Sequence, residues 1–162
     1  MPEKETIERA QEDAREGKSP STQAGEFVRE EVHHVREGKH GAASAKQAIA
    51  IGLSKARRAG VKLQPPREGK TSARTAKQAN RDYRKGQSDS SREPSATRSL
   101  ATTGALKKKG RAAASHRALS RQARAAAQKR GSTARHRSAV KANRTRARRG
   151  NAVDKEGGEG SR

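Results

Sequence analysis

The sequence predicts an all-α protein with a small N-terminal helical hairpin and a long basic C-terminal arm that is largely disordered or becomes helical on a partner. Leu, Ile, Val and Phe supply only fifteen of the 162 residues, far below the about 20% under which a highly charged chain usually stays unfolded. Ala, the strongest helix former, supplies most of the other apolar residues. Large apolar residues are sparse after Leu63, so any packed core is expected before that point.

A polar helix is expected first, from Pro2 to Glu16, in a segment of residues 1–18. Proline suits the first position of a helix, acidic residues in the first turn complement its positive end, and Gly17 is a stop signal. Its apolar stripe is thin and consists of Ile7, Ala10 and Ala14.

Residues 19–66 are expected to form the helical hairpin, which we call the head. Its first helix should begin after Ser19, a favourable N-cap, and end before Gly38. Apolar residues recur on one face, with Phe27 at the edge of that face. The residues expected to face solvent are Arg29, Glu30, His33 and Arg36.

The second helix of the head should run from Ala42 or Ala43 to Ala59 and be closed by Gly60. Gly52 lies in its apolar stripe, where the absence of a side chain permits close approach of another helix. The chain after it is expected to fold back as an apolar lid through Val61 and Leu63 before Pro65 and Pro66 end the unit.

The remainder is divided into residues 67–110, a basic helical segment with a flexible Ser/Thr-rich linker at 87–103, residues 111–150, the basic arm, and residues 151–162, a disordered tail. Ala-rich segments repeatedly end in a basic cluster and a glycine, which indicates short helices with glycine stops. These glycines are Gly60, Gly86, Gly110, Gly131 and Gly150.

Charge is the most informative property of the chain. It carries 39 Lys and Arg against 17 Asp and Glu, a formal charge of +22. Residues 1–40 hold ten acids and seven bases, whereas residues 94–153 hold seventeen bases and no acid. Such a block repels itself unless a polyanion neutralises it, so it predicts binding to nucleic acid.

The cations expected to contact phosphates lie in the arm and just before it. They are Lys107, Lys108, Lys109, Arg111, Arg117, Arg121, Arg124, Lys129, Arg130, Arg135, Arg137, Lys141, Arg144, Arg146, Arg148 and Arg149. A secondary basic face is expected on the second helix of the head, formed by Lys46, Lys55, Arg57 and Arg58. With one Phe, one Tyr and no Trp, the chain lacks a platform for stacking bases, so binding should be independent of sequence.

Several classes of function lack their residues. The absence of Cys excludes disulfides, thiolate zinc sites and a cysteine nucleophile. No apolar run is long enough to cross a bilayer, and the acidic N-terminus does not resemble a signal peptide. No nucleophile triad, carboxylate pair or phosphate-cradling loop is present, so we expect no enzyme, cofactor or small-molecule substrate.

One cluster has the residue types of a metal site. It comprises Glu30, Glu31, His33, His34, Glu37 and His40. Glu30, His34 and Glu37 share a helix face at i, i+4 and i+7, which could hold a cation weakly. A polar helix face with local ion pairs explains the pattern better, so we assign no metal.

Two stretches carry a resemblance to known proteins: Glu26 to Gly41 (EFVREEVHHVREGKHG) and Ser44 to Gly60 (SAKQAIAIGLSKARRAG). Over about residues 20–63 they resemble a family of small basic bacterial proteins of unknown function, often labelled DNA-binding or histone-like. The resemblance implies a helical hairpin with a variable basic tail and no catalytic residue. The tail also resembles those of bacterial linker-histone-like proteins, in composition alone.

We therefore expect a non-enzymatic, histone-like protein of the cytoplasm and nucleoid that binds duplex DNA through phosphates. The alternatives are an RNA- or ribosome-associated factor and, from another class, a hydrophilic stress or desiccation protectant. No membrane partner is expected. Because two short helices bury little area, the head is a candidate for homodimerisation through Val32, Ile49 and Leu53.

Overall fold

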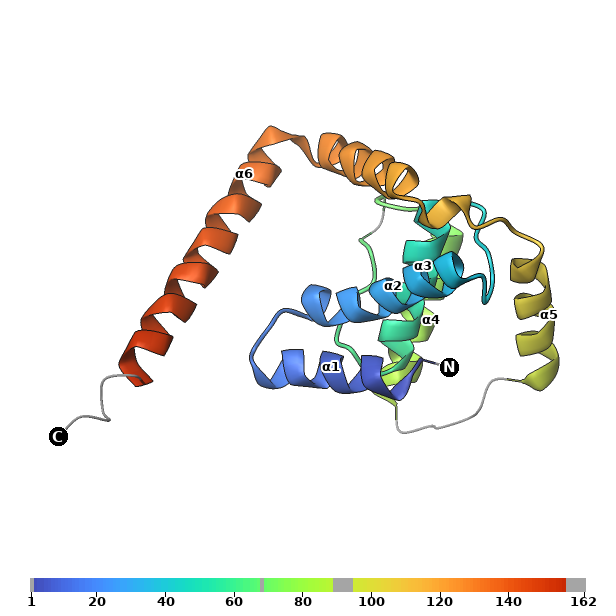
Figure 1. Ribbon diagram of the computed structural model, residues 1–162, viewed down its shortest axis with the longest axis horizontal. Coiled ribbons are helices and arrows are strands. Elements are labelled where there is room, and N and C mark those ends of the chain that lie inside the picture. The colour runs from blue at the N-terminus through green and yellow to red at the C-terminus, as the bar shows by residue number, and fades with distance from the viewer. Residues whose placement is uncertain (1, 68, 89–94, 157–162) are drawn as a thin grey trace. The chain divides into compact units, whose positions relative to one another are not determined.

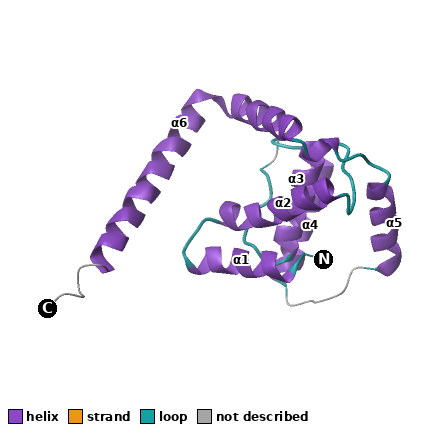
Figure 2. Cartoon of the chain, viewed as in Figure 1, coloured by secondary structure: helices purple, strands orange, loops and turns teal. Residues whose placement is uncertain are grey.

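The computed structural model describes residues 2–67, 69–88 and 95–156, and the side chains only as far as residue 147 at the C-terminal end. Within these ranges the chain forms six α-helices, one 3-10 turn and no strand, so the all-α prediction is confirmed (Figures 1 and 2). The chain divides into two compact units, residues 1–119 and 120–162.

The helical hairpin is present, formed by α2 (Pro20–Glu37) and α3 (Ala45–Arg58), which pack against each other. Ser19 is the N-cap of α2 and Gly38 ends it in the left-handed conformation, with φ of 80°. Helix α3 begins later than expected because Ser44 is its N-cap, and the Ser44 side chain accepts a hydrogen bond from the backbone N–H of Gln47.

Gly52 is where the two helices come closest. A Cβ atom built on this glycine would lie 2.6 Å from the Cα of Val28 in α2. No side chain fits in that space, so the prediction that Gly52 permits close helix approach is confirmed.

One apolar core lies among α1 (Lys4–Arg15), α2 and α3 and contains Ala10, Ala24, Phe27, Ala56 and Val61, with Ile7, Leu53 and Leu63 packed on it. The backfolded lid of Val61 and Leu63 is therefore present. Phe27, expected at the edge of the apolar face, is 1% exposed and lies in the core. Packing of α1 against α2 covers the ring, and the helical pattern of α2 alone does not contain that information.

The packed unit continues beyond residue 66, where we placed the end of the head. Helix α4 (Ala73–Gln87) packs on α3. Helix α4 ends at Gln87, one residue after the predicted stop at Gly86. A Cβ on Gly86 would lie 1.8 Å from the carbonyl oxygen of Arg57, so this glycine also permits close approach to α3. Helix α4 packs through small residues, Ala79 and Gly86, and it contains no Leu, Ile, Val or Phe that would mark the contact in the sequence.

A second core forms where the chain returns to the hairpin at η1 (Ala112–Ala114). Ala113 and Ala114 are buried with Val32, Val35, Ala42 and Ala48, and Leu119 packs against them. Before this turn, α5 (Ala96–Lys107) occupies much of the segment expected to be a flexible linker. That expectation is wrong over residues 96–103, although α5 buries none of its residues.

Helix α6 (His116–Glu156) carries most of the arm. Of the two states expected for the arm, the structure has the helical one. Gly131 interrupts the helix with φ of 76° and ψ of 168°, as expected for a stop, whereas helix continues through Gly150 to residue 156. The prediction of a disordered tail over residues 151–162 is therefore wrong for residues 151–156, which are helical. Residues 157–162 lie outside the described part.

Candidate nucleic-acid interface and a buried acid–histidine cluster

All the predicted phosphate-binding cations from residue 107 to residue 146 have exposed side chains. Among the described residues, none of these cations forms an ion pair with an acid of the chain. Arg148 and Arg149 lie in the part of α6 whose side chains are not described. The described arm therefore presents uncompensated positive charge to solvent.

Parts of this charge are ordered into stripes along the helical surface. Arg117, Arg121 and Arg124 are spaced i, i+4 and i+7 before Gly131, and Arg137, Lys141 and Arg144 repeat that spacing after it. Each spacing places three cations on one face of a helix over about 10 Å of its axis. Like charges at these spacings destabilise an isolated helix, and an anion that binds the stripe relieves that repulsion.

The secondary basic face predicted on α3 is only half available to a partner. Lys46 and Arg58 are exposed, but Arg57 is 8% exposed. Arg57 donates from Nε to the carbonyl oxygen of Leu63, which fastens the lid to α3. Burial lowers the pKa of Arg57, with an opposing contribution from Asp82.

Lys55 instead lies in a buried ion-pair network. Its Nζ is 2.9 Å from Oε1 of Glu30 and 2.9 Å from Oε2 of Glu31. The two carboxylates are almost fully buried, so the solvent-facing orientation predicted for Glu30 is wrong. Although burial opposes it, contact with the two carboxylates raises the pKa of Lys55, and hydrogen bonds from Lys55 and the Glu3 backbone hold the pKa of Glu30 below its ordinary value. Burying Glu30 is tolerated because the lysine compensates it.

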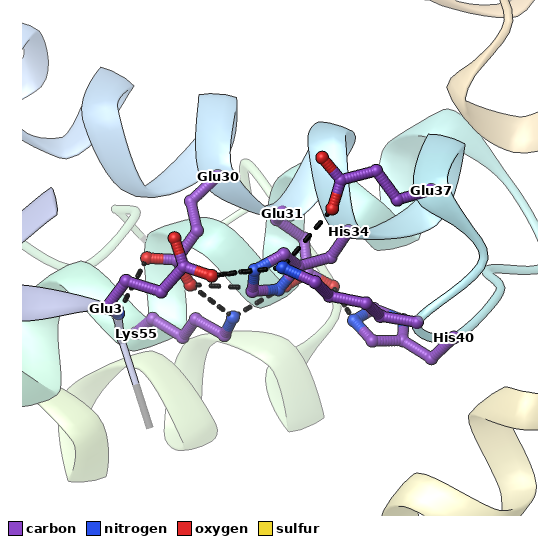
Figure 3. Close-up of polar contacts among 8 residues, drawn as sticks. Glu3, Glu30, Glu31, His34, Glu37, His40 and Lys55 are labelled. Atoms are coloured by element: carbon purple, nitrogen blue, oxygen red, sulfur yellow. Dashed lines mark hydrogen bonds and ion pairs between the residues drawn. The ribbon is translucent and has the colours of Figure 1, made fainter. Parts of the chain in front are cut away.

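Two histidines, His34 and His40, also contact carboxylates at this network (Figure 3). Nε2 of His34 lies 2.9 Å from Oε1 of Glu3, and Nε2 of His40 lies 3.4 Å from Oε1 of Glu31. Hydrogen bonds from His34 and Lys39 lower the pKa of Glu3 to about 2. The imidazole and carboxylate ligand atoms of Glu31, His34 and His40 all lie within 4.8 Å of one another.

This grouping differs from the one read from helical spacing, Glu30, His34 and Glu37. Glu37 pairs with Lys39, while His40, on the loop after α2, replaces it at the cluster. The exposed His33 lies outside. A loop residue has no helical phase, so spacing in the sequence does not reveal its contact with Glu31.

Residues 16–68 match the model of one protein family, described as a family of unknown function (DUF6496). The matched segment contains α2, α3 and the lid, and it ends before α4 and the arm. No curated protein and no solved structure matches the chain. Among the residues that the structure describes, no helix is both long and apolar enough to cross a membrane.

The three residues named for a dimer contact are largely used within the chain. Val32 is 9% exposed and belongs to the second core, and Leu53 packs on the first. Ile49 is half-buried.

Proposed function

We propose that the protein is a non-enzymatic, histone-like factor that binds duplex DNA through phosphate contacts of its basic arm. The observation that carries the proposal is the row of exposed cations from Lys107 to Arg146, none of which pairs with an acid in the described chain. Cations without internal partners are free to displace counterions from a polyanion, and that displacement drives non-specific binding to nucleic acid.

The spacing of the charges fits such a contact. Each three-cation stripe of α6 faces one direction, as required for a helix that lies along a phosphate backbone. The arm contains no Phe, Tyr or Trp, so it lacks the large aromatic platforms on which single-stranded bases usually stack, which favours a duplex. A protein with this mode of binding coats DNA with little regard to sequence, and we place it at the nucleoid.

The test compares two full-length variants with the same loss of charge. The arm variant changes six stripe cations to Gln, namely Arg117, Arg121, Arg124, Arg137, Lys141 and Arg144. The control variant changes six exposed cations elsewhere in the chain to Gln, namely Lys4, Arg15, Lys62, Arg67, Lys70 and Arg74. Both reduce the formal charge from +22 to +16, since 22 − 6 = 16.

Binding to a random-sequence DNA duplex is measured between about 50 and 200 mM salt, where each lost phosphate contact lowers the slope of log K against log salt by about 0.9. We expect the slope to fall by about 5 in the arm variant and much less in the control. Equal losses in the two variants would mean that net charge alone drives binding. A tighter complex with structured RNA than with the duplex would favour the ribosome-associated alternative, and binding to neither would favour the protectant.

A further inference from the structure

In the neutral form of His40, the contact between its ring and Glu31 lacks a proton. Nδ1 of His40 lies 3.2 Å from the carbonyl oxygen of Gly41, which can only accept, so this nitrogen carries the proton in the neutral ring. Nε2 then presents a lone pair, and it faces Oε1 of Glu31 at 3.4 Å. Two acceptors therefore face each other in the interior.

Among the residues that the structure describes, no donor reaches that carboxylate oxygen. Glu31 has 0% of its side chain exposed, and its Oε1 accepts no hydrogen bond. Lys55 lies at the other oxygen, Oε2. A buried carboxylate oxygen without a donor is costly, so a ligand at this point is expected to be a cation.

His34 is also held by an acceptor at one of its ring nitrogens. Its Nε2 lies 2.9 Å from Oε1 of Glu3, a carboxylate that accepts the proton of the neutral ring. The nitrogen left for coordination is Nδ1. A carboxylate that holds the outer nitrogen of a histidine is the usual support for a metal-ligating imidazole.

The charges of the cluster leave room for a divalent ion. The ion-pair network around the three ligands includes Glu37 at its edge, through Lys39, and joins four carboxylates, those of Glu3, Glu30, Glu31 and Glu37, with the two ammonium groups of Lys39 and Lys55. With neutral histidines the sum is −4 + 2 = −2. One divalent cation neutralises this excess in a chain that is otherwise strongly basic.

We propose that Glu31, His34 and His40 form a binding site for a divalent transition-metal ion, with Zn²⁺ the expected occupant. Two imidazole nitrogens and one carboxylate oxygen suit zinc, whereas magnesium and calcium prefer oxygen ligands alone. One ligand atom from each of the three residues lies within 4.8 Å of the other two, and the three ligands must draw closer to meet one ion. Coordination ties the loop of residues 38–44 to α2 and removes the clash of acceptors.

The test uses the untagged full chain at pH 7.5 in buffer without phosphate. Titration with Co²⁺, followed by its visible absorption, should give one site per chain, and Zn²⁺ should displace the cobalt. His34→Gln and His40→Gln should each weaken binding by at least tenfold. His33→Gln, which changes the exposed neighbouring histidine, is the matched control and should bind as the unaltered chain does.

His40→Cys protects the test from a variant that fails to fold. A thiolate at this position keeps a ligand and adds a sulfur-to-cobalt charge-transfer band in the near ultraviolet, which a merely structural histidine would not produce. Absence of saturable cobalt binding in the unaltered chain would overturn the proposal. Equal binding by the His33, His34 and His40 variants, or no new band in folded His40→Cys, would overturn it as well. None of these readouts involves nucleic acid, so they are independent of the proposed DNA binding.

Discussion

The head and the arm both contain lysines and arginines, but the head buries some of them in internal contacts whereas the arm exposes them to solvent. In the head, Lys55 lies between two buried carboxylates and Arg57 fastens the lid to α3. In the arm, the described lysines and arginines are exposed and have no acid of the chain beside them. The comparison teaches that the supply of acids, rather than the number of bases, decides whether a cation stabilises the fold or remains available to a partner.

The two regions also differ in what stabilises their helices. Helices α2 and α3 share apolar cores and approach closely at Gly52. Residues 120–156 belong to one interrupted helix, the only element among the described residues of their unit. The head therefore depends on tertiary packing and the arm on intrinsic helix propensity, which is high for Ala and Arg.

The largest effect is expected from Gly52→Leu, which tests whether the stability of the head and the DNA affinity of the arm are independent. The side chain would meet the backbone of Val28, so the packed unit should lose about 3 kcal/mol or more of its free energy of unfolding. Denaturation followed by circular dichroism measures the loss. Gly25→Ala in α2 is the control, because nothing lies within 4 Å of that position. DNA affinity should change little in Gly52→Leu, and a large loss would contradict the division of roles.

Lys55→Met should destabilise the head next most strongly. It leaves Glu30 and Glu31 buried without their cation, at a cost of about 2 kcal/mol after allowance for the partial exposure of the lysine. Chemical denaturation at pH 7 measures it. Lys46→Met removes an exposed charge from the same helix and should change stability by less than about 0.5 kcal/mol. Similar results for the two variants would mean that the buried ion pairs contribute nothing.

Acid should unfold the head and spare the arm. The folded-state pKa values of Glu3 and Glu30 are depressed, to about 2 for Glu3. Their stabilisation is therefore present above the unfolded pKa of about 4.3 and is lost as pH falls through the folded values. The melting temperature of the head should therefore fall as the pH is lowered from about 5 to about 2. Arm helicity should change little between pH 5 and pH 3, because residues 94–153, which form most of the arm helix, contain no acid.

The smallest effect concerns the charge stripe of α6. Arg121→Glu converts two repulsive pairs, with Arg117 and Arg124, into attractive ones, worth about 0.2–0.5 kcal/mol each. Helicity at low salt should rise slightly while the salt slope of DNA binding falls. Ala123→Glu adds an acid with no cation three or four residues away and should not raise helicity. A rise in both variants would show that repulsion in the stripe is unimportant.

Local signals in the sequence located the hairpin. Ser19 and Gly38 mark the limits of α2, and Gly52 marks the close approach, because capping, glycine conformation and helical phase depend on near neighbours alone. The positive charge of the arm is likewise readable from the sequence, because residues 94–153 contain seventeen bases and no acid.

Only the tertiary structure decided which polar side chains are inside. Glu30 has the pattern of an exposed residue, yet α3 places Lys55 against it, and the loop after α2 brings His40 to Glu31. Helix α4 and the turn at Ala113 and Ala114 join the packed unit through small residues, and the sequence does not distinguish these buried alanines from the many exposed ones. These contacts join residues of different elements. Their energy depends on which elements pack together, and no local stretch of the sequence contains that information.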